Sequence, residues 1–178
     1  VIGLGKLGYP IAACFAAKGY RVIGVDLDPK TVATVNLGQS PVHEPGVQEL
    51  LQSTECGFKA ISDPRPAVLD SDVTLVVVPT PSGADGKFSN KYVLSACEAI
   101  AGGLAAKENY HLVVLVSTVM PGSTGGEIQD RLEKVSGKIC GADFGLCYVP
   151  SFVALGSVVR DFLRPDYLLA GESDAKAG

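Results

Sequence analysis

Three glycines near the start of the chain, Gly3, Gly5 and Gly8, have the spacing of a phosphate-binding turn between a strand and a helix. Apolar residues precede the turn, and an alanine-rich helical pattern follows it to about Lys18. Gly3 allows the tight turn, Gly5 lets backbone amides approach a pyrophosphate, and Gly8 lets the helix pack closely on the strand. The helix N-terminus adds unpaired N–H groups and a partial positive charge. The turn therefore predicts a dinucleotide site.

An acidic residue follows the turn at the position where a ribose would lie. Asp26 ends the apolar run 21–26. A carboxylate there accepts hydrogen bonds from the adenosine ribose hydroxyls and repels a 2′-phosphate, which predicts NAD as the cofactor rather than NADP. Lys30 is a further candidate contact to the cofactor. Because a basic residue so close to Asp26 could bind a phosphate, it keeps NADP open as an alternative cofactor.

The rest of the chain alternates short apolar runs with helical patterns. Asp28 is expected to cap the second helix, with Pro29 at its first position. Expected strands are 21–26, 58–61, 73–78, 111–116 and 144–148, with a last short one over 167–170; expected helices are 6–18, 29–37, 44–51, 91–104 and 123–135, with a turn or helix from 63. This alternation predicts an α/β fold, a Rossmann-type doubly wound parallel sheet. The length of 178 residues predicts one domain over 1–178.

Charge and hydropathy exclude several classes of partner. The net charge of −4 argues against a nucleic acid or an anionic membrane, and no apolar run is long enough to span a bilayer. His43 has no neighbour at metal-ligand spacing, so no metal site is predicted, and His111 is expected at the edge of its strand. The chain starts without Met, inside the expected first strand, which suggests a clipped N-terminus.

The cysteines predict neither a disulfide framework nor a zinc site. Their number is odd and no C-x-x-C pair occurs, so a reducing, cytoplasmic location is expected. Cys14 and Cys97 fall in apolar helical stretches and are expected in the core. The others are Cys56, Cys140 and Cys147, and none lies in a motif of a catalytic thiol.

Ligands of such sheets bind at the carboxyl ends of the strands, so the loops after the strands are the next candidates. Thr80 follows the strand 73–78 and Thr118 follows the strand 111–116. Their hydroxyls could bond a nicotinamide ribose or a reacting group, and either threonine alone could equally be a helix cap or a turn residue.

Beyond the glycine turn, matching motifs run in order along nearly the whole chain. The chain resembles the N-terminal, NAD-binding domain of the UDP-glucose/GDP-mannose dehydrogenase family, which oxidises nucleotide sugars at C6. The stretches that carry the resemblance are 1–8, 24–29, 40–41 with 44–46, 78–81 with 85–86, 117–118 with 121–124, and 161–163 with 165–166.

The resemblance implies oxidation of an alcohol to a carboxylate with two NAD in sequence, through a cysteine thiohemiacetal. The nucleophilic Cys and a catalytic Lys of the family lie in a central helical domain and a C-terminal UDP-binding domain, which are absent here. This part alone is expected to bind NAD without turnover. A full-length protein is expected to be a homo-oligomer that supplies polysaccharide synthesis. The NAD contacts that carry over are Gly3, Gly5, Leu7, Gly8, Asp26, Thr80 and Thr118; Thr118 also positions a water and the reacting oxygen.

Three positions depart from the family pattern. Ser151 stands where the family usually has a Glu that serves acid–base or water chemistry, and a serine cannot replace a base near neutral pH. Leu155 replaces another Glu, and Thr31 replaces a basic residue beside Lys30. Ser151, Phe152 and Leu155 are substrate candidates. The alternatives are a catalytically weakened NAD-binding homologue or a different NAD-dependent dehydrogenase of similar fold.

Overall fold

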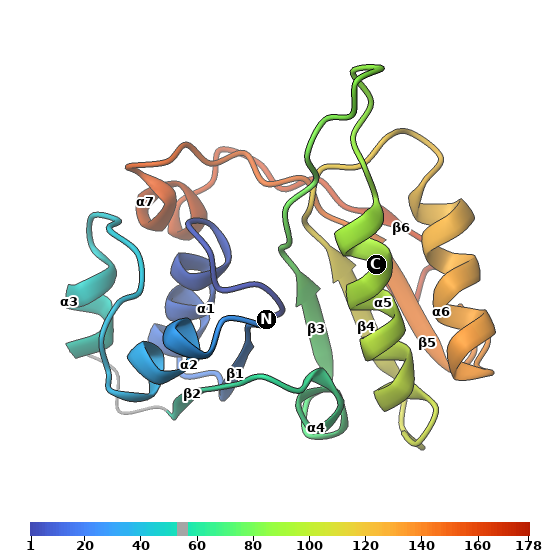
Figure 1. Ribbon diagram of the computed structural model, residues 1–178, viewed down its shortest axis with the longest axis horizontal. Coiled ribbons are helices and arrows are strands. Elements are labelled where there is room, and N and C mark those ends of the chain that lie inside the picture. The colour runs from blue at the N-terminus through green and yellow to red at the C-terminus, as the bar shows by residue number, and fades with distance from the viewer. Residues whose placement is uncertain (53–56) are drawn as a thin grey trace. The chain divides into compact units, whose positions relative to one another are not determined.

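The computed structural model describes residues 1–52 and 57–178, so Cys56 lies outside the described part of the chain (Figure 1). Contacts divide the chain into two compact units, each of which is described by itself. The first unit contains 1–63 and 151–168, and the second contains 64–150 and 169–178. Both units combine parallel strands with helices, as the α/β prediction requires.

The strands of the first unit run parallel. β1 (Val22–Val25) pairs with β2 (Phe58–Ile61) over their full lengths. The strand expected before the glycine turn is present as a parallel bridge between Ile2 and Val25. The amide of Gly3 then donates to the carbonyl of Val25 at 2.8 Å, so the turn begins beside the end of β1.

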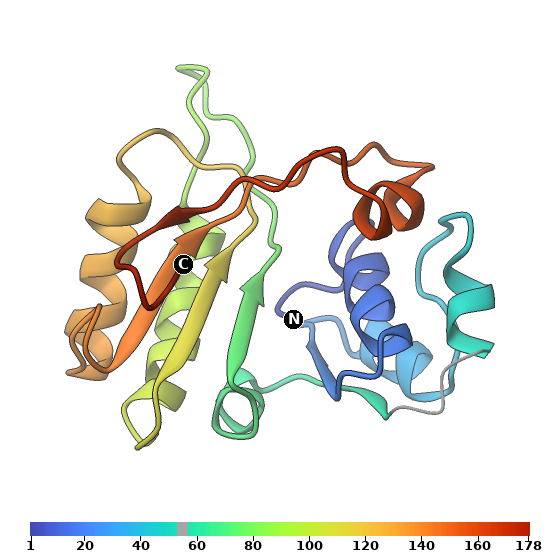
Figure 2. The same cartoon turned by 180° about the vertical axis from the view of Figure 1, so that it is seen from behind.

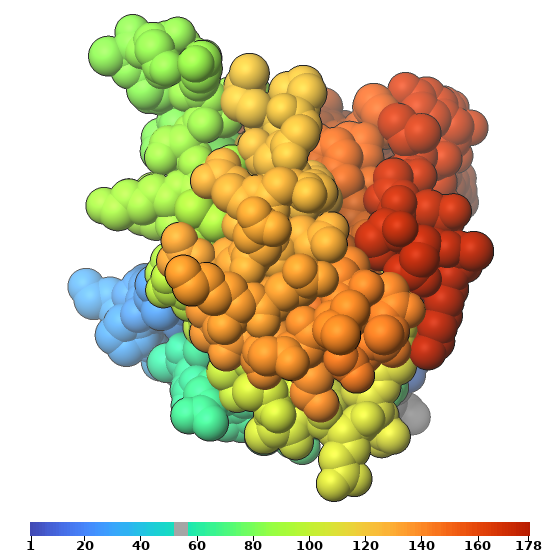
Figure 3. Space-filling view, turned by 90° about the vertical axis from the view of Figure 1, so that its right-hand side faces the viewer, coloured from blue at the N-terminus to red at the C-terminus, as the bar shows by residue number. Residues whose placement is uncertain are grey.

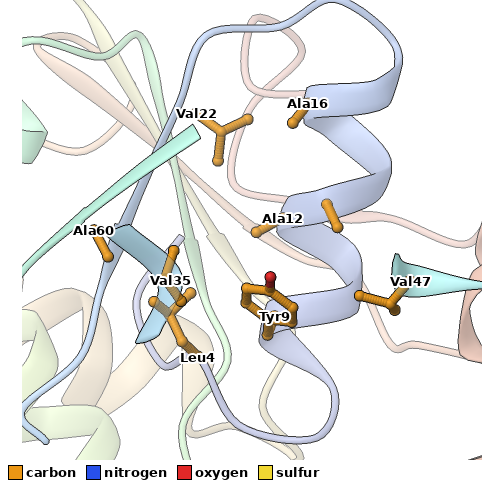
Figure 4. Close-up of a cluster of buried hydrophobic side chains, with 9 residues drawn as sticks. Leu4, Tyr9, Ala12, Ala16, Val22, Val35, Val47 and Ala60 are labelled. Carbon is orange, nitrogen blue, oxygen red and sulfur yellow. The ribbon is translucent and has the colours of Figure 1, made fainter. Parts of the chain in front are cut away.

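The core of the first unit forms around α1 (Gly8–Ala17), whose residues are nearly all buried. Small alanines let this helix lie close to its neighbours, and Tyr9 fills the space between them (Figure 4). α2 (Pro29–Asn36) begins as predicted, because the Asp28 side chain accepts hydrogen bonds from the first-turn amides. α3 (Val47–Gln52) and α7 (Val158–Leu163) complete the unit, and α7 was not predicted.

The second unit contains a four-stranded sheet in the order β3-β4-β5-β6 (Figure 2). β3 (Val73–Val76), β4 (His111–Leu115) and β5 (Phe144–Tyr148) are parallel, and β6 (Gly171–Glu172) is antiparallel to β5.

The strand expected over 167–170 is wrong, because those residues form no strand and β6 begins at Gly171. Leu168, within this range, is 81% exposed. The register is set further along, where the backbone of Ser173 donates to Leu146 and its hydroxyl accepts from the Leu146 amide.

The helices of the second unit are α4 (Pro64–Leu69), α5 (Lys91–Leu104), the π-helix η1 (Thr124–Ile128) and α6 (Gln129–Ser136). α5 packs against α4 and α6, and Figure 3 shows α6 and the turn after it on one face of this unit. The single helix expected after Pro121 is divided by the non-helical backbone of Gly126. Among the described helices, none is long and apolar enough to cross a membrane.

His111 lies in the interior of the second unit, so its expected edge position is wrong. Its side chain is fully buried, with Nε2 2.8 Å from Thr74 Oγ1 and Nδ1 3.0 Å from the carbonyl oxygen of Ser71. These polar partners make burial of the ring tolerable. Burial, assisted by the charge of Lys107, lowers the pKa of His111 to about 4, so the ring is neutral near neutral pH.

Candidate functional site

The glycine turn of the first unit has the geometry of an anion site. Gly3 has a φ of 93°, a conformation that favours glycine. A Cβ at Gly5 would meet no heavy atom within 4 Å, so packing within the protein leaves this side of the backbone open. Leu7 is the N-cap of α1 and makes no side-chain capping bond, and no acidic side chain lies in the first turn, which begins at Gly8. The amides there can therefore face a phosphate.

Asp26 lies directly against this turn. Its Oδ2 accepts a hydrogen bond from the Leu4 amide at 2.8 Å, and its Oδ1 accepts one from the Asp28 amide at 2.9 Å. These two bonds fix the orientation of the half-buried carboxylate. Each carboxylate oxygen can accept a second bond, so capacity remains for ribose hydroxyls. The turn and the carboxylate together fit the adenosine and pyrophosphate part of NAD.

Lys30 lies in the first turn of α2, with its side chain exposed. Its backbone amide donates to Asp28 at 3.1 Å. Thr31 donates its hydroxyl to the same carboxylate at 2.9 Å, which accounts for it as part of the helix cap. Lys30 therefore supplies the positive charge at the start of this helix.

In the second unit, the loops that carry Thr80 and Thr118 lie side by side at the ends of β3 and β4. Ser117 joins them, because its Oγ accepts from the Val78 amide and donates to the Val78 carbonyl, each at 2.8 Å. Thr118, next to this anchor, is exposed, and Thr80 is half-buried. The sequence placed Ser117 in the loop but gave it no role, because its partner comes from another strand.

A second polar cluster unnoticed in the sequence joins the starts of α5 and η1. Asn90 Nδ2 donates to Ser123 Oγ at 2.9 Å and to Glu127 Oε1 at 2.5 Å. These bonds hold the end of the loop 117–123 to α5. Neither Asn90 nor Ser123 caps its own helix with its side chain, although Asn90 is the N-cap residue.

The substrate candidates Ser151, Phe152 and Leu155 lie together on the segment before α7, in the first unit. Ser151 is half-buried, whereas Leu155 is exposed. Phe152 is 53% exposed and its ring lies 4.7 Å from the ring of Tyr167, centroid to centroid. Phe152 is therefore a surface residue and does not belong to the core.

The described cysteines are all free thiols, and burial raises the pKa of each. The pKa of Cys14 rises to about 11 and that of Cys97 to about 12, and both are buried in helices as expected. A thiolate is the nucleophilic form, so none of these thiols is prepared for nucleophilic chemistry near neutral pH. Within the described residues, no group of three His, Cys, Asp or Glu side chains could hold a metal ion.

Comparison with known proteins assigns a family to this geometry. The family described as UDP-glucose/GDP-mannose dehydrogenase family, NAD binding domain, matches residues 1–178. A UDP-glucose 6-dehydrogenase of Haloferax volcanii is 38% identical over 177 residues, which are 99% of this chain and 41% of that protein. A GDP-mannose 6-dehydrogenase of Pseudomonas aeruginosa is 36% identical over 180 residues, covering 100% of this chain and 41% of that protein.

Solved structures agree. A ternary complex of GDP-mannose dehydrogenase from Pseudomonas aeruginosa superposes with a TM-score of 0.95 at 35% identity, covering 99% of this chain and 41% of that one. A UDP-glucose dehydrogenase from Pyrobaculum islandicum gives 0.90 at 33% identity, covering 99% of this chain and 40% of that one. Likeness to a 3-hydroxyisobutyrate dehydrogenase of Salmonella typhimurium, at 17% identity and a TM-score of 0.60, concerns the fold alone. The chain thus covers 41% of the length of each of the two curated relatives, about two fifths.

Proposed function

Because this chain belongs to the UDP-glucose/GDP-mannose dehydrogenase family and carries its NAD-binding part, we propose that the protein oxidises the C6 alcohol of a nucleotide sugar to a carboxylate. The substrate class is a UDP-hexose, a UDP-N-acetylhexosamine or GDP-mannose. The observation that carries the proposal is the Asp26 carboxylate held 2.8 Å from the Leu4 amide of the glycine turn. The proposed reaction is a four-electron oxidation, so two NAD would be used in sequence, each accepting one hydride from C6, and water would supply the second carboxylate oxygen.

In this proposal the residues of the chain bind and orient. The amides around Gly3, Gly5, Leu7 and Gly8 hold the pyrophosphate, and Asp26 accepts from the adenosine ribose. We expect Lys30 to add charge attraction near Asp26, an exposed contribution of modest size.

We further propose that Thr80 and Thr118 contact the nicotinamide half, with Thr118 also orienting a water or the reacting oxygen. Support comes from Ser117, whose two bonds to Val78 hold both loops in place. Ser151, Phe152 and Leu155 are assigned to the substrate. Ser151 has no carboxylate, so proton transfer in this protein falls to another group.

The proposal extends to the setting of the reaction. We propose that residues 1–178 work as one NAD-binding domain, that a full-length homo-oligomer completes the reaction, and that it supplies polysaccharide synthesis in the cytoplasm. The four free thiols in the described residues suit a reducing compartment.

The test is calorimetric titration with NAD and NADP on the wild type, Asp26→Ala and Asp28→Asn. We expect the wild type to bind NAD more tightly than NADP. For Asp26→Ala we expect the dissociation constant of NAD to be roughly 10- to 100-fold higher, because hydrogen bonds to a carboxylate are worth about 1.5–3 kcal/mol. Asp28→Asn is the matched control: it removes a nearby charge, keeps a good helix cap, and is expected to leave affinity unchanged.

Turnover is tested on the full-length protein with UDP-glucose and GDP-mannose, by the appearance of NADH. Oxidation of either nucleotide sugar supports the proposal that the protein is a nucleotide-sugar dehydrogenase. NAD binding with no oxidation of any nucleotide sugar favours the weakened homologue, for which Ser151 is the specific observation. A folded wild-type protein that binds no NAD refutes the cofactor assignment.

A further inference from the structure

A buried carboxylate joins two parts of the first unit that lie far apart in sequence. Glu44 is 8% exposed. Its Oε1 accepts a hydrogen bond from the Val158 amide at 2.8 Å, and its Oε2 accepts one from the Gly156 amide at 2.9 Å, across 114 and 112 residues. Among the described residues, no ion pair includes Glu44, so these amides are the partners of its charge.

The segment that Glu44 holds is also shaped by its own backbone. Gly156 has a φ of 92°, which favours glycine, so the chain turns sharply between the two amides. Close to Glu44 in the chain, Val47 belongs to the buried apolar cluster of this unit, and Val159 packs against that cluster. The contact is therefore a packed junction with two charge-assisted bonds at its centre.

A second carboxylate holds the same segment from its exposed side. Asp161 Oδ2 accepts from the Ser157 hydroxyl at 2.6 Å and from the Ala154 amide at 3.3 Å. The amides of Ala154, Gly156, Ser157 and Val158 are thus all bonded, while the Phe152 and Leu155 side chains are 53% and 65% exposed. The segment is held at its C-terminal part and has exposed side chains, the arrangement expected of a contact surface.

We propose that Glu44 is a positioning residue that sets the place of the segment 151–157 for contact with the nucleotide sugar. This inference rests on the proposed function, which assigns Ser151, Phe152 and Leu155 to the substrate. Glu44 itself does not touch the substrate, since both of its oxygens face backbone amides of its own chain. It acts through the peptide groups of Gly156 and Val158.

The geometry separates this effect from cofactor binding. Asp26 is held by the amides of Leu4 and Asp28, and neither bond involves Glu44. Loss of the Glu44 bonds therefore displaces the segment 151–157 and leaves the ribose carboxylate in place. Displacement of a substrate-binding loop changes substrate affinity and orientation, and small displacements can have large effects on rate.

The experiment compares wild type, Glu44→Gln and Glu49→Gln in the full-length protein, with UDP-glucose and GDP-mannose as probes. In Glu44→Gln an NH2 group replaces one oxygen and faces a backbone N–H, so one amide loses its acceptor. We expect KM for the sugar to rise about tenfold while the dissociation constant of NAD changes less than about twofold. Glu49→Gln, an exposed position on α3, is the matched control and keeps wild-type values.

Each outcome of this experiment supports or overturns the positioning role of Glu44. Glu44→Gln with a wild-type KM, or with NAD affinity and sugar KM lost together, overturns the positioning role. A wild type that binds NAD but oxidises neither probe overturns the proposed function, and this inference with it. If Glu44→Gln does not fold, Glu44→Asp replaces it, because aspartate keeps the charge on a shorter side chain. An intermediate KM for the sugar with unchanged NAD affinity then supports the positioning role. A wild-type KM, or a loss of NAD affinity together with sugar KM, refutes it.

Discussion

Two neighbouring glycines at the end of α5 are expected to respond with opposite sign to the same substitution. A Cβ at Gly103 would lie 2.7 Å from Val68 Cβ and 2.9 Å from Val68 Cγ1. These atoms are fixed to α4, so the helices must move apart. Overpacking costs about 1–3 kcal/mol, and the gain in helix propensity is about 1 kcal/mol. Gly103→Ala therefore lowers the free energy of unfolding by about 1 kcal/mol net.

Gly102→Ala is the matched control. There the nearest atom to a Cβ is Arg65 Cδ at 3.5 Å, an ordinary contact. Only the propensity gain acts, so this variant is expected to be more stable by up to about 1 kcal/mol. For a chain of 178 residues the difference between the variants is about 4–8 °C in Tm, measured by circular dichroism. Equal shifts, or a Gly103→Ala protein more stable than wild type, would refute the packing argument.

Two further predictions concern stability. His111 has a folded-state pKa of about 4, against the ordinary histidine pKa of 6.5 in the unfolded chain. Between these values only the unfolded state takes up the proton, so stability is retained above about pH 6.5 and lost by up to about 3 kcal/mol as pH falls to 4. In urea unfolding across this range, His111→Asn flattens the curve, while His43→Gln, at an exposed position, keeps the wild-type slope. Asp28→Ala removes the cap of α2 and lowers the Tm at pH 7, measured by circular dichroism, whereas Asp28→Asn retains the cap; equal stability of the two variants would contradict the capping assignment.

Local signals in the sequence predicted most elements of the fold. The strand at 58–61 and the helix at 91–104 have the expected bounds, and Asp28 with Pro29 marks the start of α2. These signals are short-range: apolar periodicity, a cap and a proline act within one turn or strand. The closeness of the glycine turn to Asp26 spans 22 residues and follows from the strand–turn–helix–strand order, which places the two parallel strands side by side.

Contacts between distant residues were not predictable in this way. Glu44 reads as part of a turn before a short helix, yet its partners lie 112 and 114 residues away. Ser117 looks like one more loop hydroxyl until the neighbouring strand brings Val78 to it. His111 was misplaced for the same reason, because its partners come from β3, at Thr74, and from the chain just before it, at Ser71. The hydrophobic pattern of a sequence indicates which residues are buried, but it does not indicate which polar group from a distant part of the chain will contact them.

The junction at Glu44 also dictates an order of events as the chain is made. The first unit takes its residues from 1–63 and 151–168, so its opening stretch is synthesised well before its closing one. Until Val158 has emerged, the Glu44 carboxylate has water in place of its two amides, and closing so long a loop carries an entropic penalty. We therefore expect residues 64–150 to fold while the first unit is still open. The stretch of the first unit that is translated first must therefore wait for a stretch that is translated only after residues 64–150.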